Sequence, residues 1–295
     1  MAERVYYGGQ AVIEGVMMRG QKAAAVAVRR PDGELAIDIQ PLSRLYTGWL
    51  RKVPFARGII VLLETLVLGT RALLYSANQS LEGEDEEISR GLIWLTLLGS
   101  LVFAVFLFFI VPLLLTGLLN IKSSLLFNLA DGLIRVAIFI AYLKLTAMMP
   151  DIRRVFAYHG AEHKVVNAYE SGLPLELEAA KGCSKAHVRC GTSFLFVVVI
   201  ISVFVFALVG VHSVGLMVLS RILLVPLIAS LAYEVIYFGG RHSYNGLVRA
   251  VLTPGLWLQA LTTREPDDKQ LEVALAAMEK IVETDEAGET VQPVT

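Results

Sequence analysis

Long apolar runs separated by polar segments dominate the middle of the chain. The longest, residues 91–121, contains no charged residue, and about 20 helical residues are enough to cross the hydrocarbon core of a bilayer. Three more apolar runs follow at residues 125–145, 193–211 and 214–238. The pattern predicts four membrane-spanning helices, with a kink in the first of them at Pro112.

Charged residues inside these runs are expected to have partners. Asp131 and Arg135 lie four residues apart, so one helix face can pair them and offset the cost of their burial. Glu234 lies thirteen residues from Arg221, so these two cannot pair on one straight helix. Arg241 or Arg135 is the more reasonable partner for Glu234.

The N-terminal segment has the pattern of a small β-sheet. Residues 4–42 alternate between apolar and polar positions and are interrupted by turn residues, among them Pro31, Asp32 and Gly33. We expect roughly four short strands here.

Three further helices are predicted outside the four spans. Residues 55–80 are apolar and helical but contain Glu64 and Arg71. They fit a helix in the membrane interface, one tucked into the bundle, or a re-entrant helix. Residues 246–262 suit a helix on the headgroup surface, and residues 267–282 form an amphipathic pattern.

The predicted fold is a mainly α-helical integral membrane protein with about four transmembrane helices, interfacial helices and a small N-terminal β-sheet. The expected segments are a small cytoplasmic β domain (1–50), an amphipathic or re-entrant helix with an acidic linker (51–91), transmembrane helices 1 and 2 (92–145), a cytoplasmic connector with a His/Cys cluster (146–192), transmembrane helices 3 and 4 (193–238), interfacial and amphipathic helices (239–283) and a disordered acidic tail (284–295). Within the second segment, the acidic residues 82–87 are expected to form a solvated linker.

Composition agrees with a membrane protein. Hydrophobic residues make up 55% and charged residues 18% of the 295 residues, with a mean hydropathy of +0.61. Soluble domains average about 45–50% apolar and roughly 25% charged residues. The 26 basic residues are balanced by 27 acidic ones. We therefore expect the lipid bilayer, and no nucleic acid, as a partner.

The distribution of Lys and Arg predicts an orientation. Residues 1–57 contain nine of them, residues 150–192 six and residues 239–295 five, whereas the short links between the spans contain only Lys122. Basic residues are enriched on the cytoplasmic side of membranes. We therefore expect a multi-pass protein of the cell membrane with both termini and the connector in the cytoplasm. The first ten residues lack the pattern of a signal peptide.

The connector contains the strongest chemical signal. His159 and His163 are four residues apart, so a helix presents both imidazoles on one face, as two ligands of one divalent metal require. Together with Glu162 they match H-x-x-E-H, the inverted zincin pattern, in which the glutamate polarises a metal-bound water. The motif requires a helix, which Gly160 weakens by about 1 kcal/mol relative to alanine, and a third ligand.

Further ligands are available just before the third span. Cys183, His187 and Cys190 fall in the reducing cytoplasmic connector, where a metal ligand or a buried thiol is expected in preference to a disulfide. They could complete a tetrahedral zinc site, and Glu170 offers an oxygen ligand instead. Four protein ligands would make the site structural, and three plus water would make it catalytic. Without a metal, the histidines would be polar side chains that make ordinary hydrogen bonds, and the cysteines would be small buried hydrophobic residues.

Four separated segments carry a further signal: GGQAVIEGVMMRG (8–20), YHGAEHKVVNAYE (158–170), HVRCGTSF (187–194) and PGLWLQALTTREPDD (254–268). Together they resemble the YqhQ-like family, multi-span bacterial membrane proteins of unassigned function that are described as predicted metal-dependent enzymes. The resemblance covers roughly residues 7–278. It implies four metal ligands: His159, His163, His187 and Cys190. Val188 stands where the family has proline, which is not a ligand position, and Cys183 lies outside the motifs.

Three functions are compatible with the sequence. The first is a cytoplasm-facing, metal-dependent hydrolase, with zinc as the expected ion and Glu162 as the general base. The second is a non-enzymatic scaffold or assembly factor with a structural metal site, which would bind a membrane-protein partner or a second copy of the chain. The third is a transporter that uses Asp131, Arg135 and Glu234, which is least favoured because four spans without an inverted repeat make a poor transporter. The sequence does not indicate a substrate.

Overall fold

The computed structural model of the chain describes residues 7–81, 90–209, 214–242 and 245–287. In chain order the elements are β1 (Gly8–Val12), β2 (Gly15–Arg19), β3 (Ala23–Arg29), β4 (Leu35–Pro41), α1 (Arg44–Thr47), η1 (Trp49–Lys52), α2 (Ala56–Ser80), α3 (Arg90–Val105), η2 (Phe106–Ile110), α4 (Val111–Gly117), α5 (Ser124–Thr146), α6 (Pro150–Glu170), α7 (Leu177–Lys181), α8 (Gly191–Val209), α9 (Val214–Leu223), α10 (Val225–Arg241), α11 (Gly246–Thr262) and α12 (Asp268–Ala287). The expected acidic linker at residues 82–87 and the link around His212 lie outside the described residues.

The four strands form one antiparallel sheet in the order β1-β2-β3-β4. This confirms the small N-terminal sheet that the alternating pattern predicted. Each strand pairs with its neighbour in the chain, so that Val26 of β3 lies opposite Asp38 of β4. The turn between these two strands contains Gly33 with a φ of +91°, a conformation that glycine adopts without a steric cost.

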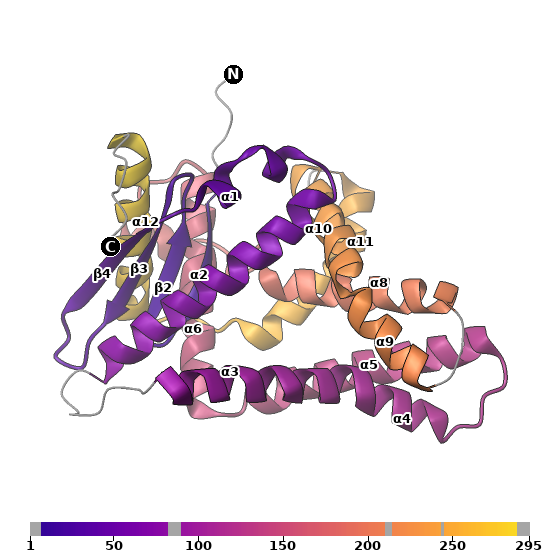
Figure 1. The fold of residues 1–295 in the computed structure, drawn as a ribbon. Coiled ribbons are helices and arrows are strands. Elements are labelled where there is room, and N and C mark those ends of the chain that lie inside the picture. The colour runs from indigo at the N-terminus through magenta and orange to yellow at the C-terminus, as the bar shows by residue number, and fades with distance from the viewer. Residues whose placement is uncertain (1–6, 82–89, 210–213, 243–244, 288–295) are drawn as a thin grey trace.

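Helices cover both faces of the sheet, with α2 on one side and α6 and α12 on the other (Figure 1). Met18 belongs to the cluster that faces α6 and α12, whereas Val26 packs with Leu68 of α2 on the opposite face. The first six residues of β3 are all buried. Because both faces of the strand are covered, its sequence of alanine and valine shows no polar alternation.

Helix α2 forms over residues 56–80, and other parts of the protein cover one of its sides. The helix packs against the sheet, η1 and α10, and its Glu64 is only 3% exposed. The opposite face of α2 exposes large apolar side chains, among them Ile59, Leu63 and Leu66. The side of the helix that faces the sheet is therefore buried against other protein elements, and its outer side is exposed and apolar.

The C-terminal helix α12 is longer than predicted. It packs Leu271 against the sheet and continues to Ala287. Near its end, the Asp285 carboxylate accepts hydrogen bonds from the backbone N–H groups of Gln21 (2.7 Å) and Lys22 (3.1 Å) in the β2–β3 turn. The prediction of a disordered tail from residue 284 onward is therefore wrong for residues 284–287, because this contact fixes the end of the helix.

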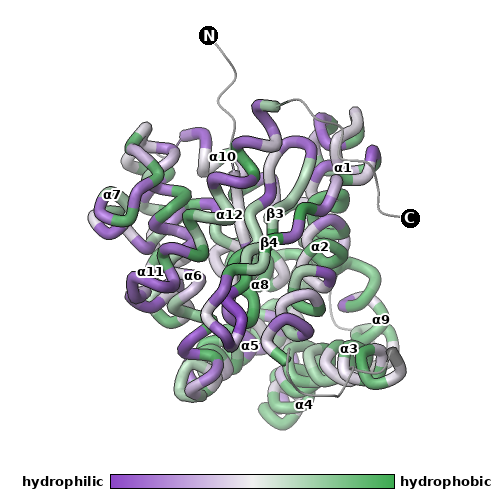
Figure 2. Tube along the Cα trace, turned by 90° about the vertical axis from the view of Figure 1, so that its left-hand side faces the viewer, coloured by the Kyte–Doolittle hydropathy of each residue, from purple (hydrophilic) through white to green (hydrophobic). Residues whose placement is uncertain are grey.

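Within the described residues, four helices are long and apolar enough to cross a membrane: Ala56–Ser80, Gly91–Gly117, Ser124–Thr146 and Gly191–Val209. The pair Gly215–Leu223 and Val225–Arg241, bent by 43°, would make a fifth if it is counted as one span. Figure 2 shows that hydrophobic residues gather on α3, α4 and α9, at the bottom of that view. The chain thus has the apolar helices expected of a membrane protein.

The first of the predicted apolar helices contains a local defect beside Pro112. A π-helical turn, η2, lies between α3 and α4, and the backbone N–H of Val111 bonds to the carbonyl of Phe106. Proline has no N–H and its ring clashes with the carbonyl four residues earlier. The wider π turn accommodates both effects. Where a kink at Pro112 was predicted, the helix thus has a π turn just before the proline.

The last apolar run is broken where a single helix was predicted. The two pieces, α9 and α10, meet beside Pro226, which occupies the first turn of α10. Glu234 of α10 pairs with Arg57 of α2 and accepts a 2.9 Å hydrogen bond from the backbone N–H of Phe55. The expectation that Arg241 or Arg135 would pair with Glu234 was wrong, because α10 packs against the beginning of α2.

Candidate metal centre

Helix α6 positions both histidines of the H-x-x-E-H motif. Pro150 and Asp151 occupy its first turn, where a fixed φ and a negative charge both favour a helix start. His159 and His163 lie on the same face, with ring centroids 4.4 Å apart. The helix that the motif requires is therefore present.

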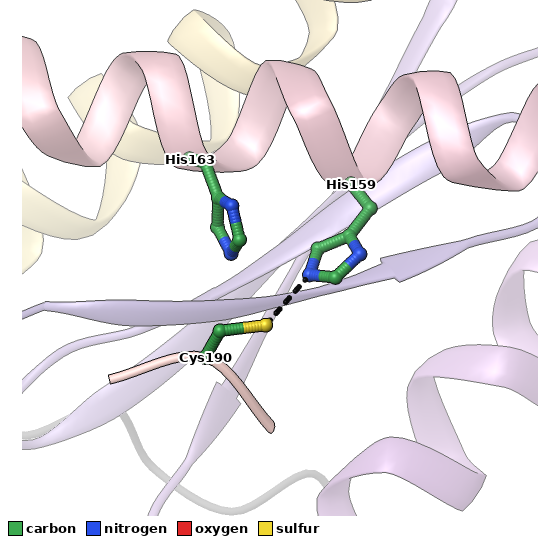
Figure 3. A group of neighbouring side chains, drawn as sticks. All are labelled: His159, His163 and Cys190. Atoms are coloured by element: carbon green, nitrogen blue, oxygen red, sulfur yellow. Dashed lines mark hydrogen bonds between the residues drawn. The ribbon is translucent and has the colours of Figure 1, made fainter. Parts of the chain in front are cut away.

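Cys190 approaches this pair from the turn that precedes α8 (Figure 3). Its Sγ lies 3.3 Å from Nε2 of His159, and one ligand atom from each of His159, His163 and Cys190 lies within 4.8 Å of the others. Neighbouring ligand atoms of a tetrahedral zinc site are roughly 3.3–3.6 Å apart. Small side-chain adjustments would bring the three atoms to that geometry.

Hydrogen bonds orient both imidazoles towards the cysteine. Nδ1 of His159 lies 2.8 Å from the carbonyl oxygen of Thr262, and Nδ1 of His163 lies 2.7 Å from that of Lys185. A carbonyl only accepts, so each Nδ1 donates its proton, and in the neutral imidazole the lone pair then lies on Nε2. Metal-binding histidines are usually held in this way by a backbone or carboxylate oxygen.

The thiol of Cys190 lies at the N-terminus of α8. The backbone N–H of Thr192 donates to its Sγ at 3.4 Å, and the side chain is 4% exposed. The positive end of the helix dipole stabilises negative charge at this position. Its Sγ therefore has the N–H of Thr192 on one side and the imidazole of His159 on the other.

The fourth expected ligand, His187, is turned away from the cluster. Its ring centroid lies 5.7 Å from that of His163, and its Nε2 lies 3.4 Å from Glu170, which also pairs with Arg189. Burial raises the pKa of Glu170, but the hydrogen bond from His187 and the charge of Arg189 together bring the pKa below its ordinary value. Glu170 thus holds the loop that contains His187 and Arg189 in place. Cys183, the other candidate ligand, donates to the carbonyl of Ala179.

A glutamine that the sequence analysis missed fastens the loop to α11. Gln259 is 1% exposed, and its side chain accepts from the N–H of His187 (3.0 Å) and donates to the carbonyl of the same residue (2.7 Å). It also donates to Oγ of Ser193 at 2.7 Å. The only signal in the sequence was one amide within the apolar run around Trp257, which does not indicate a partner.

Glu162 lies beside the cluster and faces a cavity. Its Oε2 is 3.4 Å from Nε2 of His163, and the residue is 4% exposed. The cavity has a volume of about 550 Å³ and is lined by Glu162 together with His159, His163 and Cys190. The cluster therefore consists of three neighbouring potential ligand atoms with a carboxylate and a cavity beside them.

Gly160 is required by the packing around the site, although it lowers helix propensity. A Cβ at this position would lie 2.0 Å from the carbonyl oxygen of Arg264, whose N–H bonds to the carbonyl of Phe156 at 2.8 Å. Glycine thus allows the chain after α11 to lie directly on α6, so that Thr262 reaches His159.

We expect Gly160→Ala to destabilise the protein by about 1–3 kcal/mol, as overpacking does elsewhere, and to weaken zinc binding. Thermal unfolding and zinc titration of the variant would measure both effects. Gly182→Ala is the matched control, because its new Cβ would come no closer than 3.6 Å to the carbonyl of Ala179. Wild-type stability and zinc affinity in Gly160→Ala would contradict this reading of the contact.

Comparisons with known proteins place these residues in a family. The family model described as "Protein of unknown function (DUF1385)" matches residues 53–284. The chain is also 36% identical over 303 residues to a Bacillus subtilis (strain 168) protein described as "Uncharacterized protein YqhQ". This match covers 96% of this chain and 94% of that protein. No solved structure gives a significant match.

Proposed function

The chain belongs to the DUF1385 family of proteins of unknown function, as its resemblance to YqhQ-like proteins predicted, and we propose that it is a membrane-bound, zinc-dependent hydrolase that faces the cytoplasm. The observation that carries the proposal is the convergence of His159, His163 and Cys190 beside the buried carboxylate of Glu162. A structural site would be closed by a fourth protein ligand, whereas this cluster borders a cavity.

Each residue has a distinct role in this proposal. His159, His163 and Cys190 would hold the ion, which would supply Lewis-acid activation of a water molecule. Glu162 would act as the general base and then as the general acid for the leaving group, because its Oε2 lies 3.4 Å from Nε2 of His163. The surrounding hydrogen bonds from the histidines fix the geometry before substrate arrives.

The proposed topology has four crossings. These are Gly91–Gly117, Ser124–Thr146, Gly191–Val209 and the bent pair that ends at Arg241. Helix α2 is left out because it packs on the sheet. An even number of crossings keeps both termini on one side, and the excess of Lys and Arg in the terminal segments and the connector supports the proposal that this side is the cytoplasm.

A scaffold with a structural metal is the second candidate. The ligands come from α6 and the start of α8, and His159 is also bonded to the carbonyl of Thr262 at the end of α11. A metal there would fasten the sheet-bearing part to the apolar helices and could stabilise a surface for a partner or a second copy of the chain. This candidate needs the ligands but not the carboxylate of Glu162.

The proposal is tested first by the metal content of the protein purified in detergent. Elemental mass spectrometry of the wild type should give close to one zinc per chain. The double variant His159→Ala/His163→Ala should lose it, whereas the control His242→Ala, on a histidine outside the cluster, should retain it. A well-folded wild type that takes up no zinc even when zinc is supplied would overturn both the hydrolase and the scaffold.

A further inference from the structure

The cavity beside the candidate metal centre is rich in arginine. It has a polar end formed by the metal-ligand cluster, and the rest of its wall comes from β1, β2, α2, η1 and the last turn of α10. Four guanidinium groups line it: Arg19, Arg51, Arg189 and Arg241. Only two carboxylates, Glu64 and Glu162, are among the lining residues.

Two of these arginines share a single carboxylate. Arg19 donates to Oε1 of Glu64 from Nε (3.0 Å) and Nη2 (2.9 Å), and Arg51 pairs with Oε2 of the same side chain. Burial and the neighbouring charge of Arg51 lower the pKa of Arg19, despite the opposing effects of Glu64 and Asp285. Glu64 is therefore the direct partner of both cations at this part of the wall.

The other two arginines differ in their partners. Arg189 is paired with Glu170, which compensates its charge. Arg241 lies over the ring of Tyr237, with its guanidinium carbon 4.8 Å from the centroid, and no carboxylate within ion-pair distance of it is found in the part of the chain that the structure describes. Four arginines thus face two lining carboxylates and Glu170 behind the wall, which leaves one positive charge before any metal ion is counted.

We propose that this cavity binds a phosphomonoester, which would make the protein a phosphomonoester hydrolase; this inference rests on the proposed function. A phosphomonoester carries about −1.5 to −2 charges at neutral pH, which the arginines of the wall and the proposed zinc ion would together balance. The planar fork of arginine suits phosphate oxygens, which accept two parallel hydrogen bonds. A monocarboxylate carries a single charge and has two such oxygens, whereas a phosphomonoester has three.

The chemistry balances with water as the only co-reactant. The water oxygen forms a bond to phosphorus as the ester P–O bond breaks, and the proton that Glu162 takes from water passes to the leaving oxygen. The products are an alcohol and inorganic phosphate. The arginines neutralise the charge on the phosphoryl oxygens during this step.

The phosphate group could belong to a lipid or to a soluble molecule. Val61, Thr65 and Leu68 of α2 line the cavity, while Leu63 and Leu66 lie on the apolar outer face of the same helix. A lipid headgroup could therefore reach the arginines while its chains stay beside that face. Binding measurements with both kinds of molecule decide between the two sources.

The test measures binding to the full chain, loaded with zinc, in phosphatidylcholine nanodiscs. Inorganic phosphate is titrated by calorimetry, and phosphatidic acid is compared with diacylglycerol in the nanodisc. Arg51→Gln and Arg241→Gln should each weaken phosphate binding at least about tenfold, the loss expected for a hydrogen bond to a charged group. Arg44→Gln and Arg249→Gln remove exposed arginines outside the cavity and should leave affinity within about twofold.

Each outcome bears on a different statement. Binding of both phosphate and phosphatidic acid, lost in the cavity variants, supports the inference, and much tighter binding of phosphatidic acid identifies a lipid substrate. Zinc bound without any phosphate binding overturns the inference and leaves the metal centre intact. Phosphate binding without zinc overturns the proposed function instead. Because Arg51→Gln disturbs a buried ion pair, the exposed Arg241→Gln keeps the test valid if the first variant fails to fold.

Discussion

Replacing Glu162 with glutamine is expected to leave zinc bound and to lower hydrolytic turnover by about 10²–10⁴-fold, the usual contribution of a general base. Glutamine has the same shape, so the packing of this 4% exposed side chain is preserved. Its amide cannot accept a proton from water, however. The three ligand atoms of His159, His163 and Cys190 are untouched by the substitution.

Turnover is measured as zinc-dependent release of p-nitrophenolate from p-nitrophenyl phosphate and p-nitrophenyl acetate, with zinc content determined on the same samples. Glu178→Gln, on an exposed side chain of α7, is the control and should behave as the wild type. Full zinc content with unchanged turnover in Glu162→Gln would exclude the general-base role. Activity lost together with zinc would instead make Glu162 a ligand.

Local features of the fold could be predicted because they depend on neighbours in the sequence. Alternation and the turn at residues 31–33 were enough for the sheet. The four-residue spacing was enough to place His159 and His163 on one face of α6, and to pair Asp131 with Arg135. In each case the periodicity of one element fixes the geometry.

Contacts between distant elements could not be predicted in the same way. Arg57 lies 177 residues before its partner Glu234, and nothing in either neighbourhood specifies the packing of α2 against α10. His187 is a histidine only three residues before Cys190, so the sequence alone makes it a plausible ligand. In the structure its position is determined instead by contacts with Glu170 and Gln259. Such choices depend on tertiary packing, to which a single sequence gives no direct access.

The apolar character of α2 shows a further limit. Its composition satisfies the criteria for a membrane span, but Glu64 on its inner face is bound by Arg19 and Arg51. The sequence revealed the conflict between an apolar helix and a buried charge. Only the location of the arginines, on β2 and η1, resolves it in favour of packing on the sheet.

The largest loss of stability is expected from Asp131→Asn, in the interior of the apolar helices. Oδ2 of Asp131 lies 2.7 Å from Arg135 and 3.3 Å from Arg221 of α9, and all three residues are 1–2% exposed. Arg135 also donates to Oγ of Ser202 at 2.9 Å, and both guanidinium groups lie about 5 Å from the ring of Phe206. One carboxylate thus compensates two buried cations.

Removing this carboxylate would leave two like charges unpaired in an apolar environment, a change that costs about 3–5 kcal/mol for buried pairs. Unfolding of the purified variant in detergent, followed by circular dichroism, measures the loss, and Glu34→Gln, on an exposed residue just before β4, is the control. The double variant Asp131→Asn/Arg221→Gln should recover part of the stability, because it removes one cation along with its partner. Equal stability of Asp131→Asn and the wild type would mean that water or lipid already compensates the arginines. An unaltered cellular phenotype of the double variant Asp131→Asn/Arg135→Gln would exclude the transporter hypothesis. In that case these polar residues would serve only the packing of the helices.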